Sequence, residues 1–217
     1  MALERYAHRF SCVEVNSSFY RSHRPTTWTR WAIIVPEDFR FAVKVPRTIT
    51  HERRLRDCGD LIARFVEETA GLGSKLGVLL VQLPPNLALD VEVAESFFAE
   101  LTAATPARVV CEPRHSSWFG ARPERLLADL KVARVAADPA RVAAAGLPGG
   151  WRGLSYWRLH GSPVMYRSPY GAERVADYAT LIEREHRGAE PPWCIFDNTA
   201  EMAAMGDAFE LVSQVLR

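Results

Sequence analysis

The sequence lacks the features that would mark a membrane protein or a general polyanion binder. None of its apolar runs approaches the ~20 residues that a membrane-spanning helix needs, and residues 1–6 do not follow the pattern of a signal peptide. The formal net charge of the 217 residues is only +1, so no global field attracts nucleic acid. We therefore expect no membrane partner, and nucleic-acid binding would need a local basic patch.

Cysteine is scarce, and its spacing is not that of a metal or redox motif. The four cysteines, Cys12, Cys58, Cys111 and Cys194, include no Cys-x-x-Cys pair. Three of them lie in apolar, strand-like runs, which is typical of small buried thiols in a reducing compartment. The sequence therefore predicts a cytoplasmic protein.

Two glycine-rich nucleotide-binding signatures are missing as well. No predicted strand is followed by Gly-x-Gly-x-x-Gly, and Gly-x-x-x-x-Gly-Lys does not occur. Gly71 and Gly73 lie at the end of a predicted helix, where glycine is more simply a helix C-cap. These absences argue against a Rossmann fold and against a phosphate-binding loop.

What is present is a regular alternation of strand and helix patterns. Helices are predicted between the strands, at the start of the chain and after residue 199. The predicted strands span residues 12–18, 41–46, 77–83, 108–114, 133–138, 154–160 and 193–196. Such alternation predicts right-handed β-α-β units and a parallel sheet, and the length is close to the roughly 250 residues of one barrel. We therefore predict a single domain over residues 1–217, an α/β protein with a TIM-type (β/α)8-like barrel.

Polar side chains alternate with apolar ones at the ends of six of these strands. Charged groups cannot easily face the surrounding helix layer, so side-chain alternation directs them toward the barrel axis. The residues that this argument directs inward are Glu14, Asn16, Lys44, Gln82, Glu112, Arg114, Asp138, Arg158 and His160. Active sites of barrel enzymes lie at the C-terminal ends of the strands. The pattern predicts a shared pocket there, although the same acids and bases could pair internally as a closed ion-pair network.

Several of these residues have side chains suited to catalysis. Glu112 and His160 can move protons near neutral pH, and Lys44 can form a Schiff base, bind phosphate or pair with an acid. His115 is a second imidazole, but the alternation of side chains along the strand directs it away from the axis unless the loop turns. Glu14 with Glu112 would also suit a glycosidase pair, whose separation is not visible in the sequence. The aromatic residues that could stack on a ligand, or equally cap the core, are Tyr20, Trp118, Tyr166 and Tyr170.

Metal binding is the weaker alternative for this set. His51, Glu112, Asp138 and His160 could supply ligands, but no tight spacing such as His-x-x-x-His occurs. Neighbouring cations would also repel a metal ion, so we expect no metal and no cofactor. A basic cluster in residues 47–56 (Arg47, Arg53, Arg54 and Arg56) would either grip phosphates or form a solvated loop.

Six motifs resemble those of the YecE-like family, also called domain of unknown function 72. In chain order they are VEVNSSFYR (13–21), FAVKVPRTITH (41–51), LGVLLVQLPP (76–85), EPRHSSW (112–118), RLHG (158–161) and DNT (197–199). The resemblance spans nearly the whole chain and implies a TIM-type barrel without an established activity. His51 and Asn198 lie within these motifs and are added to the expected binding residues.

The resemblance also shows where this chain departs from the family. Family members open with an additional strand, so we expect a barrel lacking its first strand, with seven strands and two open edges. Open strand edges invite pairing. We therefore expect either that the start site is placed too late in the sequence, or that a partner chain or a loop covers the gap. In the last helix, Met202 and Asp207 stand where the family leads us to expect Gly and Asn.

Three functions remain open from the sequence. The first is an enzyme, a hydrolase or lyase, that acts on an anionic and perhaps phosphate-containing substrate at the barrel mouth. The second is a noncatalytic ligand-binding or scaffold barrel with internally paired charges. The third is nucleic-acid binding or repair, by analogy with endonuclease IV, a barrel enzyme that depends on many metal ligands.

Overall fold

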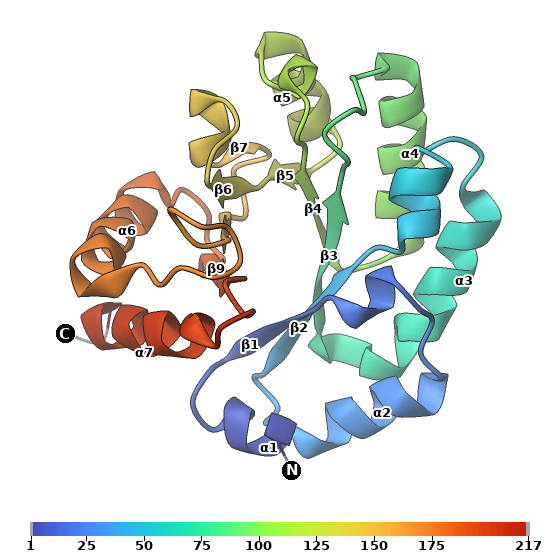
Figure 1. The fold of residues 1–217 in the computed structure, drawn as a ribbon. Helices are drawn as coiled ribbons and strands as arrows, with labels where there is room; N and C mark the ends of the chain where they lie inside the picture. Colours follow the sequence, from blue (N-terminus) through green and yellow to red (C-terminus); the bar gives the residue numbers. More distant parts are fainter. Residues whose placement is uncertain (1, 216–217) are drawn as a thin grey trace. The chain divides into compact units, whose positions relative to one another are not determined.

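The computed structural model of the chain describes residues 2–215 (Figure 1). These residues fall into two compact units. Unit 1 comprises residues up to 115 together with 130–132, and unit 2 comprises residues 116–129 and those from 133 onward. Each unit combines parallel strands with helices, so the fold is mixed α/β.

Unit 1 contains a sheet of parallel strands in the order β1-β2-β3-β4. These strands are β1 (Cys12–Val15), β2 (Arg40–Lys44), β3 (Leu76–Gln82) and β4 (Arg108–Glu112). Val43, Leu79, Leu80 and Val81 are fully buried, as expected for parallel strands covered on both faces. The continuous apolar run at 77–83 therefore predicted β3 correctly.

The helices of unit 1 include two whose first residues favour a helix start. They are α1 (Ala2–Ala7), α2 (Pro25–Ile34), α3 (Gly59–Thr69) and α4 (Val91–Ala104), with short turns η1 (Ser17–Phe19), η2 (Thr48–Glu52) and η3 (Ala70–Lys75). Pro25 occupies the first turn of α2, where a missing N–H costs nothing. Asp90 caps α4 by accepting a hydrogen bond from the Val93 N–H at 3.3 Å. In Figure 1, α2, α3 and α4 follow one side of the four strands.

Unit 2 contains a second parallel sheet in the order β6-β8-β9. Its strands are β6 (Ala136–Asp138), β8 (Tyr156–Leu159) and β9 (Trp193–Phe196), and its helices are α5 (Ala121–Asp129), α6 (Gly171–Glu185) and α7 (Ala203–Val215). Short turns η4 (Ser116–Trp118) and η5 (Ala143–Gly146) complete the unit. Helices α6 and α7 lie side by side (Figure 1). Leu159, Tyr170, Val175 and Phe196 form part of the core beneath them.

Several predicted strands are wrong in their extent. The strand predicted over 12–18 ends at Val15, before η1, and the strand predicted over 108–114 ends at Glu112. A third predicted strand is divided. Residues 133–138 form two strands, β5 (Val132–Arg134) and β6, which are separated at Val135. The last two residues of β5 pair antiparallel with β7 (Gly149–Gly150). The cause is Arg134, whose guanidinium donates to the carbonyl oxygens of Ala144 (2.8 Å) and Leu147 (3.1 Å) and so holds this segment beside β5.

Parallel strands alternating with helices are confirmed, but a closed barrel is not found in the part of the chain that the structure describes. The strands belong to two sheets, and each sheet has two ends. The single domain over residues 1–217 stays a prediction. None of the helices in residues 2–215 combines the length and apolar content needed to cross a lipid bilayer.

Candidate functional site

Glu112 is the centre of a polar cluster at the end of β4. It is 2% exposed, and both of its carboxylate oxygens accept hydrogen bonds from Gln82 Nε2 at 3.2 Å. Arg114 Nε donates to Glu112 Oε1 at 3.0 Å. Gln82 and Glu112 occupy paired positions of β3 and β4, so the parallel register brings them together. A buried carboxylate held in this way is tolerated as an anion.

The ends of β1 and β2 bring Lys44, Phe19 and His51 together. Lys44 Nζ lies 4.2 Å from the centre of the Phe19 ring, and the His51 ring meets the same phenyl group edge-on at 5.0 Å. His51 Nδ1 is 2.8 Å from Thr50 Oγ1. Burial lowers the pKa of His51, and the charges of Lys44 and three nearby arginines lower it further. His51 is therefore a neutral imidazole at pH 7.

Glu14 and Asn16 lie beside this group at the end of β1. Asn16 Nδ2 donates to Glu14 Oε1 at 3.0 Å. The hydroxyl of Ser18 bonds to the carbonyl oxygens of Val15 (3.1 Å) and Lys44 (2.7 Å), which ties the ends of β1 and β2 together. Polar residues from neighbouring strand ends are thus fixed in unit 1.

In unit 2, Asp197 links two residues that the sequence singles out. Its Oδ2 accepts a hydrogen bond from a terminal nitrogen of Arg158 at 2.9 Å and lies 3.1 Å from His160 Nδ1. Arg158 and His160 are 0% and 2% exposed. A carboxylate at Nδ1 favours the tautomer in which Nδ1 carries the proton, so Nε2 is the basic nitrogen.

Asp197 was not among the predicted site residues, although it lies in the DNT motif. The register between the strands β8 and β9 is the signal that identifies it. Leu159 of β8 pairs with Phe196 of β9, so His160 and Asp197 are the next residues along neighbouring parallel strands. The carboxyl ends of such strands meet at one edge of a sheet.

Gly161 allows the chain to turn directly after His160. Its φ is +93°, and a Cβ atom there would lie 2.9 Å from the Ser168 carbonyl oxygen. Only glycine adopts this conformation without strain. The turn places the Tyr166 ring edge-on to His160, with 5.6 Å between the ring centres, and Tyr166 remains 38% exposed.

Asp138 and Tyr170 form a separate internal network. The Tyr170 hydroxyl donates to Asp138 Oδ2 at 2.7 Å and accepts from the Gly161 N–H at 2.9 Å. Arg174 donates to both oxygens of Asp138 at 3.1 and 3.2 Å. Burial raises the pKa of Tyr170, and its hydrogen bond to Asp138 raises it further, so Tyr170 stays a neutral phenol. Its ring caps the core, which is the second of its two predicted roles.

Asn198 is fully buried beneath this network. Its Nδ2 donates to Asp207 Oδ2 at 2.7 Å and to the Ser168 carbonyl oxygen at 3.0 Å. Asp207 also accepts the N–H of Tyr170. Asp207, one of the departures from the family pattern, therefore holds the loop before α6. The other departure, Met202, is 86% exposed.

The structure assigns the predicted site residues to two groups. Unit 1 holds Glu14, Asn16, Tyr20, Lys44, His51, Gln82, Glu112, Arg114 and His115; unit 2 holds Trp118, Asp138, Arg158, His160, Tyr166, Tyr170 and Asn198. Trp118 is only 1% exposed, whereas Tyr20 is 74% exposed. The stacking role of Trp118 stays a prediction, but its ring does not face solvent. A pocket shared by all of these residues also stays a prediction.

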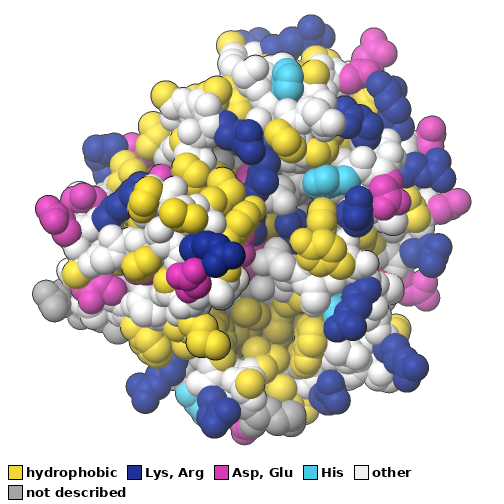
Figure 2. All heavy atoms as spheres, in the orientation of Figure 1, with side chains coloured by type: hydrophobic (Ala, Val, Ile, Leu, Met, Phe, Trp, Pro, Cys, Tyr) yellow, Lys and Arg dark blue, Asp and Glu magenta, His cyan; other side chains and the backbone are white. Residues whose placement is uncertain are grey.

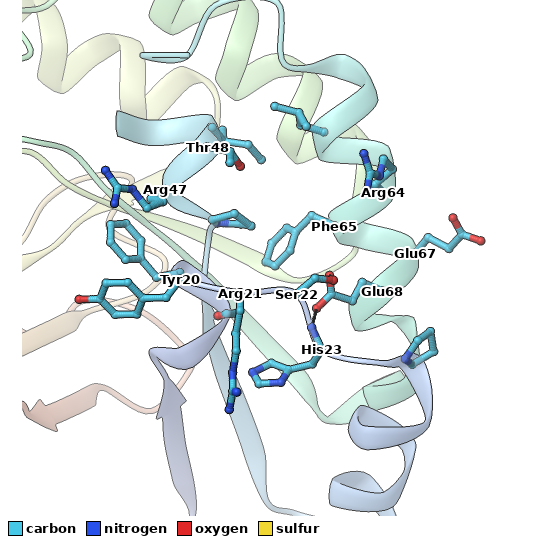
Figure 3. Close-up of a pocket in the computed structure, with 16 residues that line it drawn as sticks. Tyr20, Arg21, Ser22, His23, Arg47, Thr48, Arg64, Phe65, Glu67 and Glu68 are labelled. Carbon is cyan, nitrogen blue, oxygen red and sulfur yellow. Dashed lines mark hydrogen bonds between the residues drawn. The ribbon is translucent and has the colours of Figure 1, made fainter. Parts of the chain in front are cut away.

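A cavity of about 530 Å³ lies in unit 1, between η1, the start of η2 and α3 (Figure 3). Of the predicted site residues only Tyr20 lines it, together with Arg47 of the basic cluster. Figure 2 shows basic side chains scattered among hydrophobic and uncharged atoms on the visible face. The cavity was not predicted, because α3 and the segments around η1 and η2 come together only in the fold, and their packing leaves no periodic pattern in the sequence.

Neither Cys12 nor Cys58 is a reactive thiolate, and no metal site is found among residues 2–215. All four cysteines are free, and burial raises the pKa of Cys12 to about 12 and also raises that of Cys58. Among residues 2–215, no group of three or more His, Cys, Asp or Glu side chains is placed to hold a metal ion.

Relatives of this chain come from several bacteria. The UPF0759 protein YecE of Escherichia coli K12 is 40% identical over 83 residues, which cover 38% of this chain and only 30% of that protein. A crystal structure of a DUF72 family protein from Enterococcus faecalis V583 superposes with a TM-score of 0.85 at 20% identity, covering 99% of this chain and 88% of the other. One from Thermotoga maritima MSB8 gives 0.79 at 20% identity, covering 96% and 85%.

The structural likeness, at this low identity, establishes the fold alone. The family assignment comes from the sequence, because the family model described as "Protein of unknown function DUF72" matches residues 1–217. The chain therefore belongs to the DUF72 family.

Proposed function

We propose that this protein is an enzyme, a hydrolase or lyase, that acts on an anionic, phosphate-containing substrate at the C-terminal ends of its parallel strands. The observation that carries the proposal is the contact between Asp197 and His160, with Arg158 on the same carboxylate. A carboxylate that orients a buried imidazole is the usual arrangement of a general base.

In the hydrolase form, His160 Nε2 accepts a proton from water as the water oxygen bonds to phosphorus. The phosphorus–oxygen ester bond then breaks, and the leaving alkoxide takes the proton from His160. Asp197 stabilises the imidazolium that forms between these events. Arg158 is the proposed source of positive charge beside Asp197 and His160. Glu112, Lys44 and Arg114 are the proposed groups of unit 1 for proton transfer and anion binding.

The proposal is tested by a screen of phosphate esters, glycosides and oligonucleotides. We expect turnover of a phosphate ester that falls roughly 10²–10⁴-fold in His160→Asn and less in Asp197→Asn. His8→Asn is the matched control, because His8 is exposed and directly follows α1, and it should keep full activity. Equal turnover by the wild type and His160→Asn would remove His160 from any catalytic role.

A second candidate is a noncatalytic barrel with internally paired charges. It is favoured by the three acids that already have cationic partners: Glu112 with Arg114, Asp197 with Arg158, and Asp138 with Arg174. Under this alternative, Glu112→Gln would lower stability but change neither ligand affinity nor turnover, because breaking a buried pair is costly by itself.

Nucleic-acid or repair-type binding through residues 47–56 is the third candidate. Arg47 pairs with Glu52 at 3.3 Å and Arg56 with Asp90 at 2.7 Å, while Arg54 donates to Asn86. These contacts occupy some of the arginine N–H donors of the loop. If the loop binds oligonucleotides, their affinity must fall steeply as the salt concentration rises.

We also propose that the chain folds as a TIM-type barrel, supported by the repeated parallel β-α order, and that its partner is a small anionic ligand. A cytoplasmic location is proposed from the four free thiols.

A further inference from the structure

The cavity of unit 1 has the size and the rigid walls of a ligand site. Its volume of about 530 Å³ falls in the range of small-molecule pockets. One wall is residues 20–25, which Glu68 of α3 holds in place. Glu68 Oε1 accepts the His23 N–H at 2.6 Å and Trp28 Nε1 at 3.3 Å, while Oε2 accepts the Ser22 hydroxyl. The wall is therefore formed before any ligand arrives.

The inner surface of the cavity is apolar and contains aromatic rings. Phe65 and Ile49 are 3% and 1% exposed, so they form a floor rather than a surface. Phe19 is also nearly buried, and it meets the Tyr20 ring edge-on at 4.9 Å. Tyr20 itself is 74% exposed at the opening. Such surroundings favour a flat, apolar ring, which can stack on exposed tyrosine and cover the phenyl groups below.

The rim of the cavity is basic. In Figure 3, Arg47 and Tyr20 extend on one side of the opening and Arg64 lies on the other. Arg64 forms no ion pair within residues 2–215, and the pair of Arg47 with Glu52 is half exposed, so it is weak. Guanidinium groups bind phosphates and carboxylates through paired N–H donors.

The two acids of the lining do not suit a cationic ligand. Glu68 already accepts three hydrogen bonds from residues 22–28. The Glu67 side chain points away from the cavity (Figure 3). The unsatisfied charge at the opening is therefore positive.

We propose that this cavity is a second ligand site, which takes a small molecule made of a planar ring and an anionic group, either phosphate or carboxylate. The ring covers Phe65 and stacks on Tyr20, and the anionic group lies between Arg47 and Arg64. This inference does not depend on catalysis by His160 or Glu112, because none of the lining residues belongs to the proposed reaction.

The test is a titration followed by amide NMR shifts and calorimetry, with six probes on the full chain. Adenosine monophosphate and 4-nitrophenyl phosphate carry a ring and a phosphate, and indole-3-acetate and benzoate carry a ring and a carboxylate. Adenosine and inorganic phosphate supply each part alone. We expect at least one ring–anion probe to shift the amides of Tyr20, Thr48 and Phe65, with a Kd below about 1 mM. Ring-only and anion-only probes should bind at least about tenfold more weakly.

Two variants and one control locate the binding. Tyr20 and Arg64 are both exposed, so Tyr20→Ala and Arg64→Gln should fold and weaken binding roughly tenfold or more. Arg30→Gln changes an exposed arginine of α2 outside the cavity and should leave the affinity unchanged. The proposal is overturned if no ring–anion probe moves these amides at about 10 mM, or if both variants bind as the wild type does. Comparison of the phosphate and carboxylate probes decides between the two anions.

Discussion

His51 shows how strongly one side chain depends on its surroundings. Its partial burial and the charges of Lys44, Arg47, Arg114 and Arg54 all disfavour the imidazolium form. The pKa of His51 is therefore lowered in the folded chain, whereas it keeps its ordinary value of about 6.5 in the unfolded chain. This difference connects the protonation of one residue with the stability of the protein.

The first prediction is a pH dependence of stability. As the pH falls below about 6.5, the unfolded chain binds a proton at His51 before the folded chain does, so the free energy of unfolding decreases. Above that pH both states are neutral at this residue and the contribution of His51 is fully present. Urea unfolding at several pH values between 7.5 and 5 should show the decrease in the wild type.

His51→Gln provides the comparison for this prediction. Glutamine does not titrate, so the variant should lose less stability than the wild type over the same pH interval. His8→Gln, at an exposed position directly after α1, should lose stability with falling pH as the wild type does. If the free energy of unfolding decreased equally with falling pH in the wild type and in His51→Gln, a lowered His51 pKa would be contradicted.

At the scale of elements, the end of α2 depends on a lysine from another element. Lys75, the last residue of η3, donates from Nζ to the carbonyl oxygens of Ala32 (2.8 Å) and Val35 (2.9 Å). These carbonyls belong to the last turn of α2 and its C-cap, where a helix has no internal donors left. Glu37 lies 3.8 Å from the same Nζ but is 91% exposed, so it adds little.

The second prediction is that Lys75→Met destabilises the protein by about 2 kcal/mol, because one buried and one part-buried carbonyl group lose a charged donor. Methionine keeps the apolar stem, so packing changes little. The measurement is the midpoint of urea unfolding, provided that the dependence of the free energy of unfolding on urea concentration is the same in both proteins. Lys131→Gln, at an exposed position, should change stability by no more than about 0.5 kcal/mol. A similar loss in both variants would show that the helix-end contact is not the cause.

Elements differed in how far the sequence could predict them. The strand at 193–196 has the same limits as β9, because it is a short apolar run followed at once by a polar loop. The strand at 133–138 is interrupted, since an inner arginine, Arg134, binds carbonyl groups from residues 144–147. The residues in that contact are ten or more positions apart in sequence, and no local pattern predicts it. Residue propensity and the alternation of polar and apolar side chains thus predict strands and helices. They do not predict contacts between distant residues that divide a strand in two.

The candidate site shows the same limit at a larger scale. Side-chain parity predicted that Gln82 and Glu112 face the same way, and their pairing in neighbouring strands confirms that they meet. It could not show that Asp197 holds His160, because that contact depends on which strand becomes the neighbour of β8. Strand order is a property of the whole fold. The residues of a site are therefore easier to predict than their partners.

For the whole molecule, the relevant feature is the outermost strand of each sheet. Among the residues that the structure describes, β1 pairs only with β2 and β9 pairs only with β8. Unpaired strand edges present N–H and C=O groups that can bind a second chain.

The third prediction is that the protein self-associates through such edges. Sedimentation velocity between about 5 and 200 µM should give a weight-average coefficient that rises with concentration. Association through strand edges should persist at high salt, because backbone hydrogen bonds are less sensitive to screening than surface ion pairs. A constant coefficient over this range, equal to that of a monomer, would contradict the prediction.

Phe19 lines the cavity of unit 1 and also lies under Lys44 and against His51. An anion bound in the cavity would offset part of the positive charge that now keeps His51 neutral, so the ligand and the proton would help each other to bind. Proton uptake would then accompany binding, and the measured heat would change with the ionisation enthalpy of the buffer. By reciprocity, the affinity of the cavity would increase as the solution becomes more acidic. Because the cavity adjoins His51 through Phe19, its occupancy would thus depend on the acidity of the solution.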